Sequence, residues 1–205
     1  MRPHELQPVL DRINEKDIQG DIIAFGIGRD EDELDTLLGF CKDRGCSLYM
    51  IDSFKGLPEP ENEEDRTPNE KDKGRHEWGE TEYHRGQFCK PLMEVMSHIA
   101  KQNIDWFNHA FIVPGWFKDT LPDLQHDEPD NIYAGCLIDV DYLSSMKIVL
   151  EYMNGKLHKN GIIACHECLQ LETVNIMADN YKLLRDNEGE LVINTSAFYT
   201  IPEYQ

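Results

Sequence analysis

Side chains able to bind a metal or accept a proton follow two apolar segments in the last third of the chain. Asp139 lies in the segment 135–142, and His166 and Glu167 close the segment 160–167. Each segment predicts a buried strand, and the residues between them have helical spacing. Strands joined through a helix run parallel, so their carboxyl ends meet at one edge of a sheet. We therefore expect Asp139, His166 and Glu167 to lie close together.

A second group of glycine and acidic residues follows the first apolar segments of the chain. Gly26 and Gly28 end the apolar run 21–28, and Asp52 follows the run 47–51. An acid about 25 residues beyond such glycines can accept hydrogen bonds from ribose hydroxyls. The third glycine of a dinucleotide-binding fingerprint is missing, so spacing gives only weak support for NAD binding. Similar turns occur in any doubly wound domain, and the spacing alone leaves that interpretation open.

These residues need a scaffold of alternating strands and helices to bring them to one edge. Residues 182–185 and 191–201, separated by the turn residues 186–189, predict an antiparallel hairpin at the C-terminal end. We expect an α/β fold with a Rossmann-like, doubly wound, mostly parallel sheet, in a single domain of residues 1–205. The expected helices are 4–16, 30–43, 88–101, 143–157 and 172–181, and the expected strands also include 47–51 and 109–113.

The segment 55–86 is rich in charge and almost without apolar residues. A solvated loop is the favoured interpretation. A loop of this length inside a compact domain can also be a lid over a site. Its last part contains His76, Trp78, Tyr83 and His84, which could supply a stacking surface or a proton acceptor.

Two further segments carry expectations about exposure. The helix expected at 88–101 has a predicted buried stripe, whereas His98 falls on its predicted surface. Residues 125–130 are expected to form an acidic loop. The predicted stripe consists of Leu92, Val95, Met96 and Ile99.

Composition excludes several classes of protein. The formal net charge is -19, from 39 acidic and 20 basic residues. This balance disfavours binding to nucleic acid and to anionic membranes. No apolar run approaches the roughly 18 residues of a membrane-spanning helix, and residues 1–21 lack the apolar core of a signal peptide. We therefore expect a cytoplasmic protein with no membrane or nucleic-acid partner.

The six cysteines are expected to be reduced. Cys136 and Cys165 lie in apolar runs, where cysteine behaves as a small buried apolar residue. Cys165 and Cys168 have the CxxC spacing of a zinc site, but no second ligand pair stands at a matching spacing. Ordinary cysteines are the favoured interpretation.

Four segments together resemble the macrocin O-methyltransferase (TylF-type) family, within the class I S-adenosylmethionine-dependent methyltransferases. Two of them are specific: a D-S-F-x-G-L-P block after the second strand and a G-x-F-x-D-T-L-P block after the third. The other two, a first strand with its glycine turn and a D-x-D strand followed by a G-I strand, occur in many methyltransferases. The segments are 20–27, 52–58, 115–122, and 139–141 with 160–163, and the resemblance runs from about Gly20 to Glu167.

The resemblance implies a site for S-adenosylmethionine. Asp52 would bind the ribose hydroxyls, and Phe25 and Gly26 would lie at the turn next to the methionine part. Ser53, Gly115 and Trp116 would surround the adenosine. The family methylates sugar hydroxyls, so the resemblance implies a small-molecule acceptor, such as a glycoside or another diol-containing natural product, and a possible homo-oligomer.

The resemblance also implies a divalent metal on the acceptor side, with Asp139 as a ligand. The family's paired aspartates after the last parallel strand are replaced here by His166 and Glu167. Magnesium prefers oxygen ligands, whereas a histidine admits manganese, iron, nickel or zinc more readily. We expect magnesium or manganese on Asp139, His166 and Glu167. At the methionine end, Ala24 stands where relatives have glutamate, and Arg29-Asp30 replace a glycine-rich turn.

These residues define a mechanism and its alternatives. A metal that binds two adjacent hydroxyls lowers their pKa and orients them for attack on the methyl group. His84 or His76 is a candidate general base, and His166 could be the base if it is not a ligand. The alternative is a relative that binds S-adenosylmethionine without catalysis, as a regulatory or partner protein. An NAD-dependent enzyme is disfavoured by the C-terminal hairpin and the two specific blocks.

Overall fold

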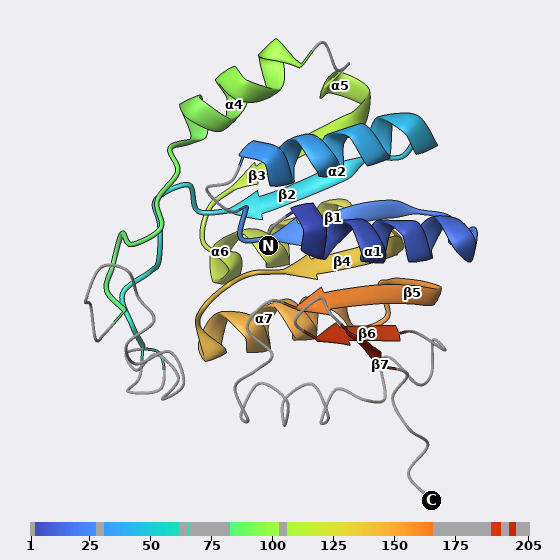
Figure 1. The fold of residues 1–205 in the computed structure, drawn as a ribbon. Coiled ribbons are helices and arrows are strands. Elements are labelled where there is room, and N and C mark those ends of the chain that lie inside the picture. The colour runs from blue at the N-terminus through green and yellow to red at the C-terminus, as the bar shows by residue number, and fades with distance from the viewer. Residues whose placement is uncertain are drawn as a thin grey trace, which may run out of the picture.

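The computed structural model of the chain describes residues 3–27, 31–61, 65, 83–102, 106–165, 190–193 and 197–199. Within these ranges one sheet is packed between two layers of helices (Figure 1). None of the helices in the described ranges combines the length and the apolar character needed to span a bilayer.

The central strands of the sheet, at Asp21–Phe25, Leu48–Asp52 and Tyr133–Ile138, are buried along most of their length. The seven described strands of the sheet have the order β3-β2-β1-β4-β5-β6-β7, and every neighbouring pair is parallel except β6 and β7. Parallel strands covered on both faces need continuous apolar runs, as the sequence provides. The strands are β1 Asp21–Phe25, β2 Leu48–Asp52, β3 Ala110–Pro114, β4 Tyr133–Ile138, β5 Leu157–Cys165, β6 Glu190–Ile193 and β7 Ala197–Tyr199.

Alternate residues of each central strand enter two separate cores. Ile22 and Ala24 of β1 face the core under α1, α2 and α4, whereas Ile23 and Phe25 face the core under α6 and α7. Figure 1 shows α1 and α2 on the near face of the sheet and α6 and α7 on the far face. The helices are α1 Pro3–Glu15, α2 Glu31–Arg44, α4 Leu92–Lys101, α5 Trp106–His109, α6 Phe117–Asp127 and α7 Leu143–Met153.

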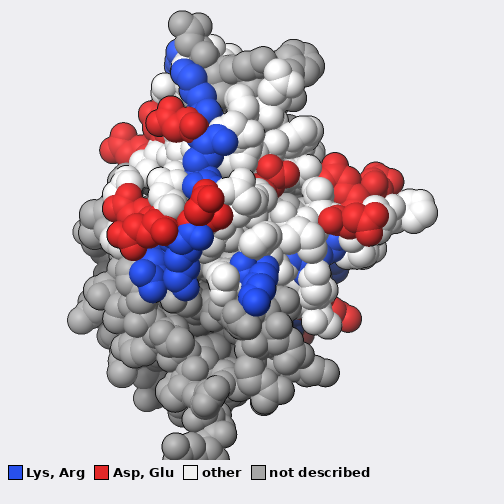
Figure 2. Space-filling model, turned by 90° about the vertical axis from the view of Figure 1, so that its right-hand side faces the viewer, with Lys and Arg blue, Asp and Glu red and all other residues white. Residues whose placement is uncertain are grey.

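The parallel arrangement gives the sheet two different edges. The strands β1 to β5 all begin at one edge, called here the amino edge, and end at the other, the carboxyl edge. Asp52 and Asp139 stand at the carboxyl edge because each ends or directly follows a strand. Figure 2 looks onto the amino edge, where basic and acidic side chains are interleaved.

The predicted α/β fold with a mostly parallel sheet is confirmed. The C-terminal hairpin is not confirmed as predicted, because its first arm, 182–185, lies outside the described residues. Its second arm, predicted as one strand over 191–201, contains parts of β6 and β7, which pair antiparallel with each other. β6 itself runs parallel to β5. The helix expected at 172–181 also lies outside the described residues.

The acidic loop expected at 125–130 is wrong over its first half, because α6 continues to Asp127. Leu121 and Leu124 are buried beneath this helix, and their spacing of three residues places them on one face. Burial of these two leucines therefore extends the helix into a sequence of polar residues.

Two expectations about α4 are wrong. Met96 was expected in the buried stripe but is 40% exposed, whereas Val95 and Ile99 are buried as expected. His98 was expected on the surface, yet its side chain is only 11% exposed. Its ring lies between two carboxylates of α2, with Nδ1 3.2 Å from Glu31 and Nε2 2.5 Å from Asp35. The contact with α2 therefore turns His98 inward and leaves Met96 outside.

The expectation that Cys165 is a simple buried thiol is wrong in one respect. Its side chain is fully buried, as predicted. Its sulfur, however, is disulfide-bonded. The described cysteines at 41, 46, 89 and 136 are free thiols.

Candidate functional site

The carboxyl end of β2 places Asp52 at the centre of a network of backbone hydrogen bonds. Its Oδ2 accepts the backbone N–H of Ile27 at 2.8 Å, and its Oδ1 accepts that of Phe54 at 2.6 Å. Its own carbonyl accepts the N–H of Gly115 at 2.8 Å. Asp52 therefore ties together the segments that follow β1, β2 and β3.

Burial and a second carboxylate determine the electrostatics of Asp52. Burial raises the pKa of this side chain, and the nearby charge of Asp139 raises it further. The N–H groups of Phe54 and Ile27 oppose this rise because they stabilise the ionised form. Asp139 is thus a second acidic group at the carboxyl edge, and its charge acts on Asp52 in the same direction as burial.

Gly26 fixes the distance between the turn after β1 and the residues after β4. Its φ is +75°, and a Cβ built on it would lie 1.8 Å from the carbonyl oxygen of Asp139. On the same side, the N–H of Asp139 donates to the carbonyl of Phe25 at 2.9 Å. Only glycine fits this contact, so Gly26 allows the backbone of Asp139 to lie directly against the turn.

Three of the predicted cofactor-binding residues have clear positions. The side chain of Phe25 is buried in the core, with its ring 5.8 Å from that of Phe117, so only its backbone reaches the carboxyl edge. The hydroxyl of Ser53 donates to the carbonyl of Gly56 at 2.8 Å, within the turn after β2. Trp116 is half-buried at the N-cap position of α6.

Gly115, directly before Trp116, has φ +149° and lies against α6. A Cβ there would stand 2.4 Å from Cγ2 of Thr120. The hydroxyl of Thr120 in turn donates to the carbonyl of Trp116 at 3.1 Å. Glycine at position 115 therefore lets the first turn of α6 pack closely beneath the end of β3.

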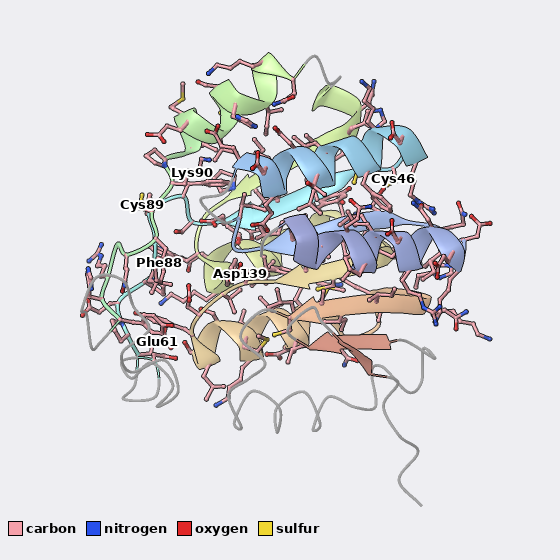
Figure 3. All side chains as sticks on the ribbon, viewed as in Figure 1. Cys46, Glu61, Phe88, Cys89, Lys90 and Asp139 are labelled. Atoms are coloured by element: carbon pink, nitrogen blue, oxygen red, sulfur yellow. The ribbon has the colours of Figure 1, made fainter. Side chains whose placement is uncertain are left out.

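The acceptor side of the site is described only in part. Asp139 stands at the carboxyl edge, and Figure 3 shows it on the same side of the molecule as Phe88 and Lys90. His166, Glu167 and His76 lie outside the described residues, so their approach to Asp139 stays a prediction. Within the described ranges no three His, Cys, Asp or Glu side chains are grouped closely enough to hold a metal.

The two ends of the charged segment 55–86 are joined by backbone hydrogen bonds. The N–H of Leu57 donates to Gln87 at 2.8 Å, and the N–H of Gly86 donates to Leu57 at 2.9 Å. His84 lies exposed in the turn beside this junction, and its N–H donates to Oε1 of Gln87 at 3.2 Å. The junction places the segment next to the end of β2. Its role as a lid stays a prediction.

Asp65 is a residue that the sequence did not single out. It lies in the segment expected to be solvated, yet it is only 1% exposed. Its Oδ1 accepts the backbone N–H of Ser144 at 3.1 Å, in the first turn of α7. The N-cap residue of α7 is Tyr142, which makes no side-chain cap hydrogen bond. The carboxylate that accepts an N–H in the first turn of α7 therefore comes from a distant segment of the chain, and no pattern in the sequence indicated it.

Asp65 connects the charged segment to the acceptor side of the edge. α7 begins four residues after Asp139, and the ring of Tyr142 lies 5.9 Å from that of Tyr83. One residue from each described part of the segment, Asp65 and Tyr83, therefore contacts the start of α7.

Comparison with known proteins gives a match along nearly the whole chain. The profile of the family described as "Macrocin-O-methyltransferase (TylF)" matches residues 1–199. A curated relative from Streptomyces olivaceus is named 8-demethyl-8-(2,3-dimethoxy-alpha-L-rhamnosyl)-tetracenomycin-C 4'-O-methyltransferase. It is 25% identical over 164 residues, which cover 79% of this chain. The match spans only 58% of the relative's own length.

Solved structures of similar fold are also methyltransferases. The O-methyltransferase NovP superposes with a TM-score of 0.63 at 18% identity, covering 90% of this chain and 72% of NovP. The calicheamicin methyltransferase CalS11 has a TM-score of 0.63 at 21% identity, covering 88% and 71%. The apo structure of CalS11, described as a TDP-rhamnose 3'-O-methyltransferase, has a TM-score of 0.55 at 20% identity, covering 89% and 72%. At these identities the likeness concerns the fold.

Proposed function

The chain belongs to the macrocin O-methyltransferase (TylF) family, and from this premise we propose that it transfers a methyl group from S-adenosylmethionine to a sugar hydroxyl. The acceptor class is a glycosylated small molecule or another small diol. One observation carries the proposal: Asp52 and Asp139 stand at the same edge on either side of the turn after β1, where Asp52 accepts the N–H of Ile27 and the backbone of Asp139 lies against Gly26. That arrangement offers one carboxylate to a cofactor and another to an acceptor.

The described residues fit the ribose of S-adenosylmethionine. Each oxygen of Asp52 accepts one backbone N–H. A carboxylate has about four acceptor positions, so capacity remains for two ribose hydroxyls. Because Ile27, Phe54 and Gly115 hold Asp52 through backbone contacts, its carboxylate is oriented before any ligand arrives. S-adenosylmethionine would supply the electrophilic methyl group, and Gly115 and Trp116 would lie beside the adenosine.

We further propose that the acceptor side uses a divalent metal, with Asp139, His166 and Glu167 as its ligands. Two carboxylates and an imidazole suit manganese well and tolerate magnesium. A metal there would lower the pKa of a sugar hydroxyl. Asp139 is positioned for such a role by its N–H bond to Phe25 and by the Gly26 contact. If His166 is not a ligand, it takes the role of general base, with His84 as the other candidate.

Calorimetry and a methyl-transfer assay test the proposal together. Binding of S-adenosylhomocysteine would be measured first, followed by transfer of labelled methyl groups to a panel of rhamnosides and other glycosides. We expect binding in the wild type, methylated product from at least one glycoside, and loss of product in Asp139→Asn with binding retained. Binding without product from any glycoside would favour the alternative of a non-catalytic relative. Absence of binding would contradict the proposal.

A chelator distinguishes an acceptor side that holds a metal from one in which His166 acts as the general base. Activity that is lost in EDTA and restored by manganese or magnesium supports the metal. Full activity in EDTA would remove the metal from the proposal and leave His166 as the base. In that case His166→Ala should abolish transfer, and the matched variant His158→Ala, at a half-buried position of β5 before Gly161, should keep it.

A further inference from the structure

The C-terminal end of α2 carries a pair of thiols that methyl transfer does not use. The helix ends in a Schellman motif, in which the N–H of Gly45 donates to Lys42 at 3.2 Å and that of Cys46 donates to Cys41 at 3.0 Å. Gly45 takes the left-handed conformation that this motif requires, with φ +68°. The motif brings the residue after the glycine against the last turn of the helix. In this chain the two side chains that meet are both cysteines.

The two thiols are in contact but have different surroundings. Cys46 packs against the core cluster that contains Cys41, and each thiol shifts the pKa of the other, upward for Cys41 and downward for Cys46. Cys41 is fully buried, whereas Cys46 is half-buried and can be reached from the surface. Both are free thiols. A disulfide requires two backbones that already lie close together, and the 3.0 Å hydrogen bond between Cys46 and Cys41 supplies that closeness.

The charges around the pair favour a thiolate on Cys46. The Cys41 thiol lowers the pKa of Cys46, and the guanidinium of Arg44 lowers it further. Burial and the carboxylate of Asp21 act in the opposite direction. Arg44 is held in place by hydrogen bonds to Oδ1 of Asn14 at 2.6 Å and to the carbonyl of Ile18 at 2.7 Å. The neighbouring Cys46, together with burial, raises the pKa of Cys41, which stays protonated.

We propose that Cys41 and Cys46 form a reversible dithiol–disulfide site that reacts with small-molecule disulfides such as oxidised glutathione. The Cys46 thiolate attacks one sulfur of the reagent, the reagent's S–S bond breaks, and a glutathione thiolate leaves. Cys41 then loses its proton and attacks the Cys46 sulfur of the mixed disulfide, which releases the second glutathione. Two protein thiols are oxidised to one disulfide, and one glutathione disulfide is reduced to two thiols.

The site lies far from the carboxyl edge. Figure 3 labels Cys46 at the opposite end of the sheet from Asp139. The carbonyl of Cys46 accepts Nδ1–H of His109 at 2.9 Å, and the next residue, Ser47, donates its N–H to Asp21 at 2.8 Å. A disulfide would join the last turn of α2 to the start of β2 at the amino edge. It does not depend on methyl transfer, and we expect oxidation to leave the affinity for S-adenosylhomocysteine unchanged.

Peptide mapping of the oxidised full-length protein tests the proposal. The protein is incubated in oxidised glutathione, quenched with an alkylating reagent and digested with trypsin. Trypsin cuts after Lys42 and Arg44, so a disulfide between the two cysteines links the peptides 30–42 and 45–55. We expect this linked pair, and its loss on treatment with dithiothreitol. Glutathione adducts on Cys46 without any linked pair would overturn the proposal.

Variants separate the influence of Cys41 on the pKa of Cys46 from the disulfide. Cys41→Ala removes both and should slow alkylation of Cys46 about tenfold, because less thiolate is present. Cys41→Ser retains a hydroxyl donor, so it should keep fast alkylation of Cys46 while forming no linked pair. Cys89→Ser, which removes an exposed cysteine outside the pair, should leave the link intact. Unchanged alkylation in Cys41→Ala would overturn the pairing of the thiols. If a variant fails to fold, the mapping of the wild type still decides.

Discussion

The two edges of the sheet use the same hydrogen-bonding arrangement in different surroundings. At the amino edge Asp21 of β1 accepts the N–H of Ser47, which precedes β2, at 2.8 Å. At the carboxyl edge Asp52 of β2 accepts the N–H of Ile27, which follows β1, at 2.8 Å. In each case an aspartate on one strand holds the end of the neighbouring strand.

The difference between the edges lies in what stands next to each aspartate. Asp52 also accepts the N–H of Phe54, and the charge of Asp139 raises its pKa. The turn next to it contains Gly26, which is packed against the backbone of Asp139. At the amino edge, by contrast, a Cβ on Gly45 would meet nothing within 4 Å. A carboxylate that orders a strand end is therefore a structural feature of both edges. Only the carboxyl edge also has a second carboxylate and a close backbone contact, and these make it the candidate binding site.

Gly26→Ala should give the largest effect. Positive φ and overlap with the carbonyl of Asp139 force the backbone apart, and we expect a loss of about 3 kcal/mol or more in the free energy of unfolding. In a chain of this size that lowers the melting temperature by roughly 6–12 °C. Gly39→Ala is the matched control, because Gly39 lies within α2 with no atom within 4 Å of a built Cβ. It should stabilise by about 0.5–1 kcal/mol. Equal melting temperatures for the two variants would contradict the close contact.

A comparison of the variants Asp52→Asn and Asp21→Asn tests whether only the carboxyl edge binds the cofactor. Loss of a charged acceptor for ribose hydroxyls should weaken binding of S-adenosylhomocysteine by roughly 10- to 100-fold in Asp52→Asn. Asp21→Asn should leave affinity unchanged, since its carboxylate holds only the amino edge. Calorimetric titration of both variants measures the difference. A similar loss of affinity in both would mean that Asp52 acts through stability instead of direct contact.

Asp21→Ala tests the structural half of the comparison. The N–H of Ser47 loses its acceptor, and we expect a loss of about 1 kcal/mol in the free energy of unfolding. Urea denaturation gives this value, and cofactor affinity measured in parallel should not change. If Asp21→Ala loses cofactor affinity while remaining folded, the two edges are coupled and the comparison fails.

Asp52 should also make the free energy of unfolding depend on pH, and we expect this effect to be smaller than those of the substitutions above. Burial raises its pKa above the ordinary value of 3.8. A raised pKa means that the stabilising contribution is present when the group is protonated and is lost as pH rises through the folded-state pKa. The unfolding free energy of the wild type minus that of Asp52→Asn should therefore fall as pH rises from 3.8 toward neutrality. A difference that rises over this range would show that the hydrogen bonds from Ile27 and Phe54 outweigh burial.

The sequence predicted the elements of the fold and most of the carboxyl edge. Apolar runs and helical spacing placed β1, β2, β3, β4 and β5 within a few residues of their bounds. Because parallel strands end at a common edge, the positions of Asp52 and Asp139 after their strands predicted that both would stand at the carboxyl edge, and the family resemblance added Gly115. The specific blocks after β2 and β3 predicted the family, which the family profile confirms.

Contacts between distant segments were decided only by the tertiary structure. The sequence could not show that Asp65 would be buried against Ser144, that His98 would lie between Glu31 and Asp35, or that Cys165 would be disulfide-bonded. Polar residues carry no periodic signal that names a distant partner, and burial depends on which helices meet. Apolar periodicity is a local property, so the sequence alone determined the strands, the helices and their common edge. The partners of buried polar groups depend on the packing of the whole chain, and only the folded structure determined them.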